Sequence, residues 1–400
     1  MKDILRNLAV YASARALPSL MTFLFTIICI ESLTAAEYGG YSLILLPLTM
    51  AASFAGSLAG QPMLRFGREL SLKGRRSGLF GVPTMVAVIV LPLLLLHLYV
   101  ADRSMIVMSI SVALVMVTAV LESHRGYFIA MSSAVSILRI DAVRSAASVL
   151  LLILFLKMGY ATSWAPLVSM ACAATLALLA IPAYIKSGEK EGQRLVDAAY
   201  IRYGFWVACW MAVIVLLQLL ERIIIESQFG ISAVGSYSAI ADPIAMVISA
   251  VGGIVANALM PRFIEAWNDH KLMAIRQLTL ASLAAVFFAA SLCFVAGSVV
   301  LILDFGRWAV LLRSNIMLSL LLLTGITLWQ AGVFVHKPLE LRGKTGAMFA
   351  CVVVSLLAFI LMAVPMVKLW GAEGIAVAKL LAGGVYLGLI MVFIRRVRPA

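Results

Sequence analysis

The sequence predicts an all-α polytopic membrane protein with about 12 transmembrane helices. The first observation is composition: hydrophobic residues make up 64% of the 400 residues and charged residues only 12%, whereas soluble domains carry about a quarter charged residues. The second is that apolar runs of about 20 residues recur, each long enough to cross the hydrocarbon core as a helix. Because unpaired backbone polar groups are costly in lipid, these runs are expected to be helical.

The expected spans divide evenly between the two halves of the chain. They are 9–31, 40–62, 79–99, 104–122, 136–156, 162–185, 203–226, 233–258, 278–303, 315–335, 346–367 and 372–394. The charged segment 186–202 separates the sixth span from the seventh. We therefore expect two domains, an N-terminal six-helix bundle at 1–192 and a C-terminal six-helix bundle at 193–400.

The third observation is an internal repeat between the second and eighth spans. Residues 39–56 align without a gap with residues 235–252, and eight of the eighteen positions are identical, mostly Gly, Tyr, Ser, Pro and Met. One interpretation is a duplicated half, which is typical of transporters; six spans per half would make it a parallel repeat. The other is that two similar helices share small residues by chance.

The distribution of positive charge predicts the orientation. With twelve spans both termini share a side, and 21 of the 31 Lys and Arg residues lie on that side, against five on the opposite side. The positive-inside rule places both termini in the cytoplasm. The net charge of +13 then indicates topology and attraction to anionic membrane lipids, and no nucleic-acid partner is expected.

We expect neither an enzyme active site nor a metal site in this chain. The four histidines stand alone near the ends of spans, without the partner spacing of a metal or catalytic motif. The five cysteines are spread one per apolar segment, which is typical of unpaired thiols. We expect no catalytic residue, no cofactor and no metal. The residues are His97, His124, His270, His336, Cys29, Cys172, Cys209, Cys293 and Cys351.

Ionisable residues within the spans are the candidate functional residues, because each costs about 2.5–3.5 kcal/mol near the bilayer centre. Arg15 shares a helical face with Ser19, Thr22 and Thr26, which suits the wall of a wet cavity. The alternative for Arg15 is that its side chain reaches the cytoplasmic surface. Glu122 is the weakest candidate, since it is expected at the cytoplasmic edge of the fourth span.

Further candidates lie in the fifth, seventh, eighth and twelfth spans. Asp141 and Arg144 share one face of the fifth span, and local pairing between them is the alternative to a cavity role. Glu221 and Arg222 fall near the outer end of the seventh span, Asp242 lies in the eighth, and Lys379 lies deep in the twelfth. Two prolines, Pro47 and Pro243, occupy equivalent repeat positions and are predicted flex points.

Cations outnumber carboxylates among these residues, which favours an anionic cargo. Arg in particular binds phosphate groups with two parallel hydrogen bonds and stays charged when desolvated. The carboxylates Glu221, Asp242 and Asp141 are candidates for ion coupling; alternatively, each neutralises a neighbouring Arg. The cations are Arg15, Arg139, Arg144, Arg222 and Lys379.

Four short segments resemble the polysaccharide flippases of the MOP superfamily, the MATE-like exporters of O-antigen and exopolysaccharide units. Residues 33–42 (LTAAEYGGYS) resemble the family's LG-x-x-E-Y-G-x-Y turn, with Thr34 in place of the usual Gly. Glu221-Arg222 followed by residues 234–238 (VGSYS) resembles the entry to the eighth span. Residues 259–262 (LMPR) and 371–376 (GAEGIA) resemble the exit of the eighth span and the entry to the last.

This resemblance implies two bundles that form a V around a central cavity, with alternating access across a bacterial cell inner membrane. It implies an undecaprenyl-pyrophosphate-linked oligosaccharide as cargo, contacted by Arg15, Arg144, Arg222 and Lys379. Polysaccharide polymerase and chain-length machinery are the implied protein partners. The alternatives are a cation-coupled multidrug exporter of the same superfamily and a non-transporting membrane partner of polysaccharide assembly.

Overall fold

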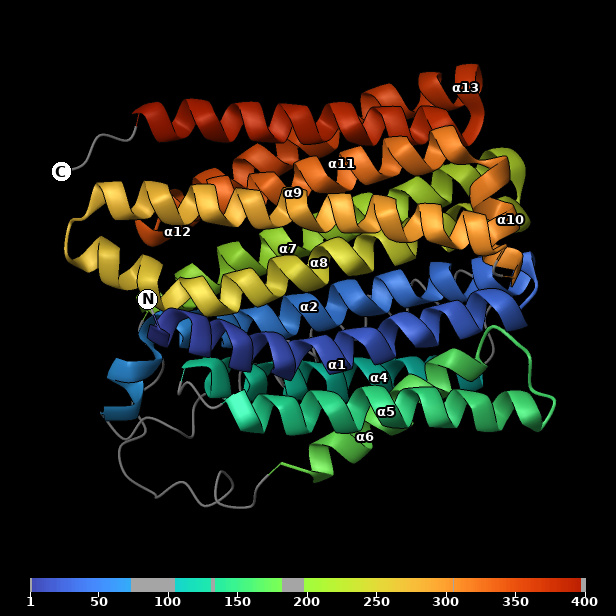
Figure 1. Ribbon diagram of the computed structural model, residues 1–400, viewed down its shortest axis with the longest axis horizontal. Coiled ribbons are helices and arrows are strands. Elements are labelled where there is room, and N and C mark those ends of the chain that lie inside the picture. The colour runs from blue at the N-terminus through green and yellow to red at the C-terminus, as the bar shows by residue number, and fades with distance from the viewer. Residues whose placement is uncertain (1, 73–104, 131–133, 182–197, 305, 397–400) are drawn as a thin grey trace. The chain divides into compact units, whose positions relative to one another are not determined.

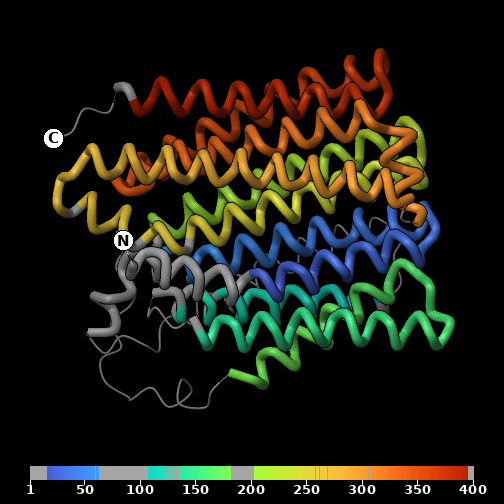
Figure 2. The backbone as a smooth tube through the Cα atoms, in the orientation of Figure 1, coloured from blue at the N-terminus to red at the C-terminus, as the bar shows by residue number. Residues whose placement is uncertain are grey.

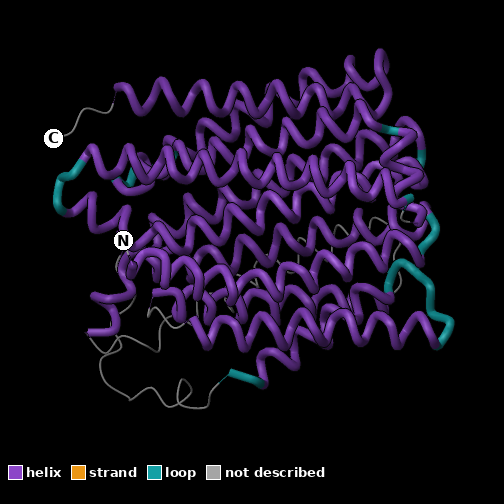
Figure 3. The backbone as a smooth tube through the Cα atoms, in the orientation of Figure 1, coloured by secondary structure: helices purple, strands orange, loops and turns teal. Residues whose placement is uncertain are grey.

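The computed structural model describes residues 2–72, 105–130, 134–181, 198–304 and 306–396. Within these ranges all regular structure is helical, without strands (Figure 1 and Figure 3). The all-α fold class predicted from the apolar runs is therefore confirmed.

The helices follow the expected spans closely, and Figure 2 traces their order along the chain. Eleven expected spans overlap helices, several of which extend beyond the expected ends, while the third, 79–99, lies outside the described residues. The helices are α1 (Lys2–Ser32), α2 (Ala35–Leu72), α4 (Met105–Ala130), α5 (Ala134–Lys157), α6 (Ala165–Leu179), α7 (Ala198–Phe229), α8 (Ile231–Asn268), α9 (Leu272–Leu303), α10 (Gly306–Ser314), α11 (Ile316–Val335), α12 (Lys337–Leu341) and α13 (Thr345–Arg396).

Length and apolar character mark this chain as a multi-pass membrane protein. In the described ranges, six helices are long and apolar enough to cross a membrane, namely α2, α7, α8, α9, α11 (with α12) and α13. Large apolar side chains are exposed on their surfaces, as at Phe287, Phe288 and Leu292 of α9. Such exposure is unfavourable in water and suits contact with lipid.

The last helix, α13, is two spans joined by a sharp break. Trp370 and Gly371 have non-helical backbone angles, and Gly371 has a φ of 59°, which is favourable only for glycine. The chain turns back there, so that a Cβ atom at Gly374 would overlap the backbone of Met366. The expected boundary between the spans 346–367 and 372–394 is therefore confirmed.

The chain separates into two compact units. Unit 1 comprises Met1–Ser19, Thr26–Ser42 and Leu220–Ala400, and unit 2 comprises Leu20–Phe25 and Leu43–Leu219. In unit 1, Phe263, Val286 and Phe334 belong to a core formed by α8, α9 and α11. In unit 2, α4, α5 and α6 pack together. The domain boundary near residue 192 and the V shape stay predictions.

The two repeat helices have the same length and the same register. Helices α2 and α8 each contain 38 residues, and Gly39 and Gly235 are the fifth residue of each. Their first turns contact one another: a Cβ atom at Gly39 would overlap Ile231, and one at Gly235 would overlap Ala35. Equivalent positions therefore meet around a local pseudo-two-fold axis, which supports the duplication interpretation.

Candidate functional site

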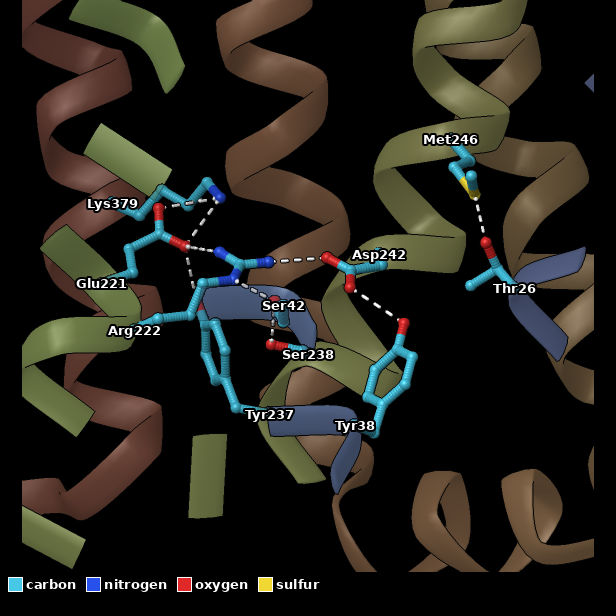
Figure 4. Close-up of polar contacts among 10 residues, drawn as sticks. All are labelled: Thr26, Tyr38, Ser42, Glu221, Arg222, Tyr237, Ser238, Asp242, Met246 and Lys379. Atoms are coloured by element: carbon cyan, nitrogen blue, oxygen red, sulfur yellow. Dashed lines mark hydrogen bonds and ion pairs between the residues drawn. The ribbon is translucent and has the colours of Figure 1, made fainter. Parts of the chain in front are cut away.

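A buried network of charged and hydroxyl groups lies in unit 1 beside this crossing (Figure 4). Its members come from the start of α2, the C-terminal part of α7, the start of α8 and the second half of α13. The orientation predicted by the positive charges places this end of the helices on the outer side of the membrane. The members are Tyr38, Ser42, Glu221, Arg222, Tyr237, Ser238, Asp242 and Lys379.

Arg222 is the centre of the network and is only 2% exposed. Its Nη2 lies 2.6 Å from Oδ1 of Asp242, its Nε donates to Oγ of Ser42 at 3.1 Å, and its Nη1 lies 3.5 Å from Oε2 of Glu221. The guanidinium group also lies 5.7 Å from the centre of the Tyr237 ring. These contacts occupy the Arg222 guanidinium group. In this conformation the side chain exposes almost no surface that a ligand could contact.

Glu221 is a fully buried carboxylate held by three donors. Lys379 Nζ lies 2.9 Å from Oε1 and 3.1 Å from Oε2, and the Tyr237 hydroxyl donates to Oε2 at 2.8 Å. Arg222 is the third donor. An ionised carboxylate only accepts hydrogen bonds, so it is matched to three partners that all donate. Glu221 therefore balances the charge of Lys379 inside the protein.

Asp242 and the serine pair complete the network on the α2 side. The Tyr38 hydroxyl donates to Oδ2 of Asp242 at 2.9 Å, and the carboxylate is 27% exposed. The Oγ atoms of Ser42 and Ser238, which are equivalent repeat positions, lie 3.0 Å apart. Close approach of the backbones at the glycine crossing brings these short side chains together.

Two cations and two carboxylates make this network electrically neutral when all four are ionised. The sequence predicts surplus positive charge at Arg222 and Lys379, but the structure places a carboxylate against each of them. The alternative that Glu221 and Asp242 neutralise neighbouring cations therefore describes this geometry. Contact of Arg222 or Lys379 with cargo stays a prediction, as does ion coupling at Glu221 and Asp242.

A second charge cluster lies in unit 2, between α4 and α5. Glu122, Arg125, Asp141 and Arg144 form a ring of alternating charges, with nitrogen–oxygen distances of 3.4 to 3.8 Å. Asp141 is buried, whereas the Arg144 side chain is 32% exposed. The predicted local pair of Asp141 with Arg144 is thus present at 3.8 Å, within a larger array that leaves Arg144 accessible.

A third cluster is found at the junction of α11 and α12 in unit 1. His336 Nδ1 is 2.8 Å from the Tyr386 hydroxyl, and Lys337 pairs with the buried carboxylate of Glu340 at 2.5 Å. The Tyr386 ring stacks on Trp329, whose Nε1 donates to the carbonyl oxygen of Lys379. His336 is therefore a buried, hydrogen-bonded residue, although the sequence places it alone at a span end.

For the remaining predicted residues, Arg15, Pro47 and Pro243, the structure gives the position in a helix and does not test the predicted role. Arg15 falls within α1, but its side chain lies outside the described residues. Pro47 and Pro243 lie inside the continuous helices α2 and α8, and their role as flex points stays a prediction. Within the described ranges no group of three or more His, Cys, Asp or Glu residues is placed to hold a metal ion.

The sequence did not point to Tyr38 and Ser42 as partners of the buried charges, and the predicted fourth span, 104–122, ends before Arg125. Helix α4 runs to Ala130 instead of ending at residue 122, which brings Arg125 onto the helix beside Asp141. The signal that pointed to the serines was the repeat itself, since Ser42 and Ser238 are identical repeat positions. Shared residues in two packed helices are candidates for their mutual contact.

The fold and these clusters define the chain as a helical polytopic membrane protein with buried charge networks. No family model matches the sequence, and no curated protein matches it. Solved structures do match. The MATE multidrug transporter DinF-BH in complex with R6G has a TM-score of 0.68 at 13% identity, covering 99% of this chain and 96% of its own.

Two other solved structures show the same likeness. The lipid II flippase MurJ in an inward closed conformation has a TM-score of 0.65 at 12% identity, covering 97% of this chain and 87% of its own. A mutant of the Vibrio cholerae MATE transporter VcmN has a TM-score of 0.70 at 13% identity, covering 99% and 98%. The chain therefore shares the fold of these structures, and a further structure with this fold is a multidrug resistance MATE family transporter of the MOP superfamily.

Proposed function

We propose that this protein is a flippase of a bacterial inner membrane. It moves an undecaprenyl-pyrophosphate-linked oligosaccharide from the cytoplasmic to the periplasmic leaflet by alternating access, for O-antigen or exopolysaccharide synthesis. Both termini lie in the cytoplasm, and the polymerase and chain-length machinery act on the delivered unit. The fold, shared over 97% of the chain with a lipid II flippase, supports the proposal, as do the four sequence segments.

The observation that carries the proposal is the partly exposed side chain of Arg144. Its ion pairs are long, at 3.6 Å to Glu122 and 3.8 Å to Asp141, and 32% of its side chain is exposed. A pyrophosphate oxygen approaching from the exposed side can form shorter, charge-assisted hydrogen bonds than those existing pairs. We therefore assign recognition of the anionic head group first to Arg144, ahead of the buried Arg222 and Lys379.

The second candidate function is that of a multidrug exporter. Several of the similar structures are MATE transporters, and the charge balance around Arg222 and Lys379 weakens the case for an exclusively anionic cargo. Such an exporter would carry organic cations and couple their movement to an ion bound at a carboxylate such as Asp141, Glu221 or Asp242. A non-transporting partner of polysaccharide assembly is the third.

Reconstituted proteoliposomes distinguish these functions. We expect the purified protein to flip a fluorescent polyprenyl-pyrophosphate oligosaccharide and to leave a cationic dye such as ethidium untransported. We expect Arg144→Ala to slow flipping about tenfold or more, since a hydrogen bond to a charged group contributes about 1.5–3 kcal/mol. Lys157→Ala removes an exposed positive charge from the same helix and should leave the rate unchanged.

The test also requires the thermal stability of the Arg144→Ala variant and the transport of the cationic dye. The melting temperature of Arg144→Ala must stay close to that of the wild type, so that loss of flipping reports cargo contact. Dye efflux without lipid flipping would establish the multidrug exporter instead. Protein that moves neither cargo would support the assembly partner.

A further inference from the structure

The turn between the first two helices packs with the C-terminal part of the chain. We call residues 26–42 the outer hairpin; it comprises the end of α1, the turn at Leu33 and Thr34, and the start of α2. These residues share a compact unit with Leu220–Ala400, whereas α2 from Leu43 onwards belongs to unit 2. Helix α2 therefore changes unit directly after Ser42, five residues before Pro47.

The first set of hairpin contacts is with the buried network. Tyr38 donates to Asp242, Ser42 accepts from Arg222, and the Ser42 and Ser238 hydroxyls meet at 3.0 Å. The Thr26 hydroxyl adds a contact with the Met246 sulfur at 3.2 Å. All these partners in the C-terminal half belong to α7 and α8.

The second set of contacts ties the hairpin to α10. The carboxylate of Glu31 accepts hydrogen bonds from the backbone N–H groups of Arg307 and Trp308 at 2.9 and 3.0 Å. It thereby satisfies donors at the N-terminus of α10 that have no partner within the helix. The Arg307 side chain returns a bond of 2.6 Å to the carbonyl oxygen of Leu33.

Glycine permits this second arrangement. Gly306 has a φ of 67°, and a Cβ atom there would come within 2.8 Å of the Glu31 carboxylate. The first turn of α10 and the end of α1 are thus shaped to fit each other. The hairpin is held at two separate places by elements of the C-terminal half.

From these contacts we propose that the outer hairpin is a latch, closed in this structure, that releases α7, α8 and α10 once in each transport cycle. Arg222 is then a positioning residue that holds the latch through Ser42, rather than a group that touches cargo. This inference rests on the proposed function, because a cargo that leaves at the outer side requires the outer ends of the two halves to separate.

The division of charge across the latch makes its release feasible. All four charged members of the network, Glu221, Arg222, Asp242 and Lys379, belong to α7, α8 and α13. The hairpin contacts described above reach the charged groups of this network through neutral hydroxyl groups, those of Tyr38 and Ser42. Withdrawal of the hairpin therefore removes one hydroxyl partner each from Arg222 and Asp242 but leaves the ion pairs of the network intact. Loss of a buried counter-charge, which would be the costly step, is avoided.

The second set of contacts is equally suited to reversible opening. The hydrogen bonds from α10 to Glu31 lie at an exposed position, so water can replace them when the helices part. At the glycine crossing, backbone lies directly against backbone at Gly39 and Gly235.

A reversible cross-link tests the latch. In a cysteine-free background, Ser42→Cys and Ser238→Cys replace hydroxyls that are 3.0 Å apart, so oxidation should join them. We expect the oxidised protein to flip lipid-linked oligosaccharide at least tenfold more slowly, with recovery after reduction. The single variants, treated identically, show the effect of each substitution alone.

A second cross-link serves as a matched control. A Cβ atom at Gly325 would lie 3.8 Å from Cβ of Leu380, a separation suited to a disulfide. The pair Gly325→Cys and Leu380→Cys joins α11 to α13 within the C-terminal half, and its oxidation should leave flipping active. If the oxidised Ser42–Ser238 variant flips at the wild-type rate, the latch does not open and the inference is overturned.

A measurement without cargo separates the latch from the proposed function. Spin labels at Thr34→Cys and Ser232→Cys, on the hairpin and on the start of α8, report the distance across the latch by electron double resonance. In lipid we expect two populations of the distance between the labels, one short and one long. When residues 42 and 238 are also joined covalently, by a cross-linker that does not react with the spin-labelled cysteines, we expect only the short distance. A single short distance in lipid and with cargo contradicts the latch, even if flipping occurs. A long population in a protein that flips nothing supports the latch and removes the cargo assignment.

Discussion

The buried carboxylate of Glu221 is contacted by the cations Lys379 and Arg222 and by the hydroxyl group of Tyr237. The balance of charge in this region depends on both cations and on the carboxylate. Lys379 and Arg222 come from helices far apart in sequence, and Asp242 balances the second cation. Removing one member of such a group leaves a buried charge without its partner, which is far more costly than the loss of an exposed pair. The network therefore acts as a unit in stability.

The first prediction concerns Glu221→Gln. It leaves Lys379 without a counter-charge, and removal of one partner of a buried ion pair costs about 3–5 kcal/mol. We expect a clear fall in the thermal unfolding midpoint in detergent, followed by intrinsic fluorescence. Adding Lys379→Met to Glu221→Gln should recover most of this loss, because the Arg222–Asp242 pair is then balanced again.

The exposed pair of Lys271 and Asp269 provides the comparison. Lys271→Met should leave the unfolding midpoint unchanged, since exposed ion pairs contribute little. Equal effects of Glu221→Gln and Lys271→Met, or failure of the double variant to recover, would contradict the assignment of Lys379 as the partner of Glu221.

On the scale of helices, the crossing of α2 and α8 determines which side chains can meet. Each helix presents a glycine at its fifth position and a serine three residues later. The glycines bring the backbones together, and the serines then reach each other across the pseudo-two-fold axis. The charges break this symmetry, because Asp242 of α8 is replaced by Leu46 at the equivalent position of α2.

The second prediction concerns Gly235→Ala. Its Cβ atom would overlap the backbone of Ala35, and overpacking of this kind costs about 1–3 kcal/mol. We expect a lower unfolding midpoint and weaker cross-linking between cysteines at 42 and 238. Gly297→Ala in α9 is the control: no atom lies near that position, and replacing a helical glycine by alanine gains about 0.5–1 kcal/mol. If both variants behave alike, the crossing does not depend on the absent side chain.

For the molecule as a whole, the helices and the local pair of Asp141 with Arg144 could be predicted from sequence. The side-chain contacts between helices that are distant in the chain could not. Hydropathy reports which segments enter lipid, and Gly371 marks the turn within α13, because both signals are local. The pairing of Arg222 with Asp242 and Ser42 depends on how three helices rotate against one another. The repeat was the one sequence signal that reached across the chain, and it pointed to Ser42 and Ser238.

Topology is the last prediction, and it follows from α13. A straight helix of its 52 residues would measure about 78 Å at 1.5 Å per residue, against a hydrocarbon core of about 30 Å. The break at Gly371 therefore makes two crossings. Lys368, beside the break, should face the periplasm, and Lys344, before α13, should face the cytoplasm, as the charge distribution predicts.

Single cysteines at these two exposed positions measure this topology in a cysteine-free background. A membrane-impermeant maleimide applied to spheroplasts should label Lys368→Cys directly and Lys344→Cys only after lysis. Labelling of both from outside would contradict the two-crossing structure of α13. The reverse pattern would preserve the two crossings and invert the protein in the membrane, so that the outer hairpin would lie in the cytoplasm. A latch there could not control release to the periplasm, and the direction proposed for transport would be wrong.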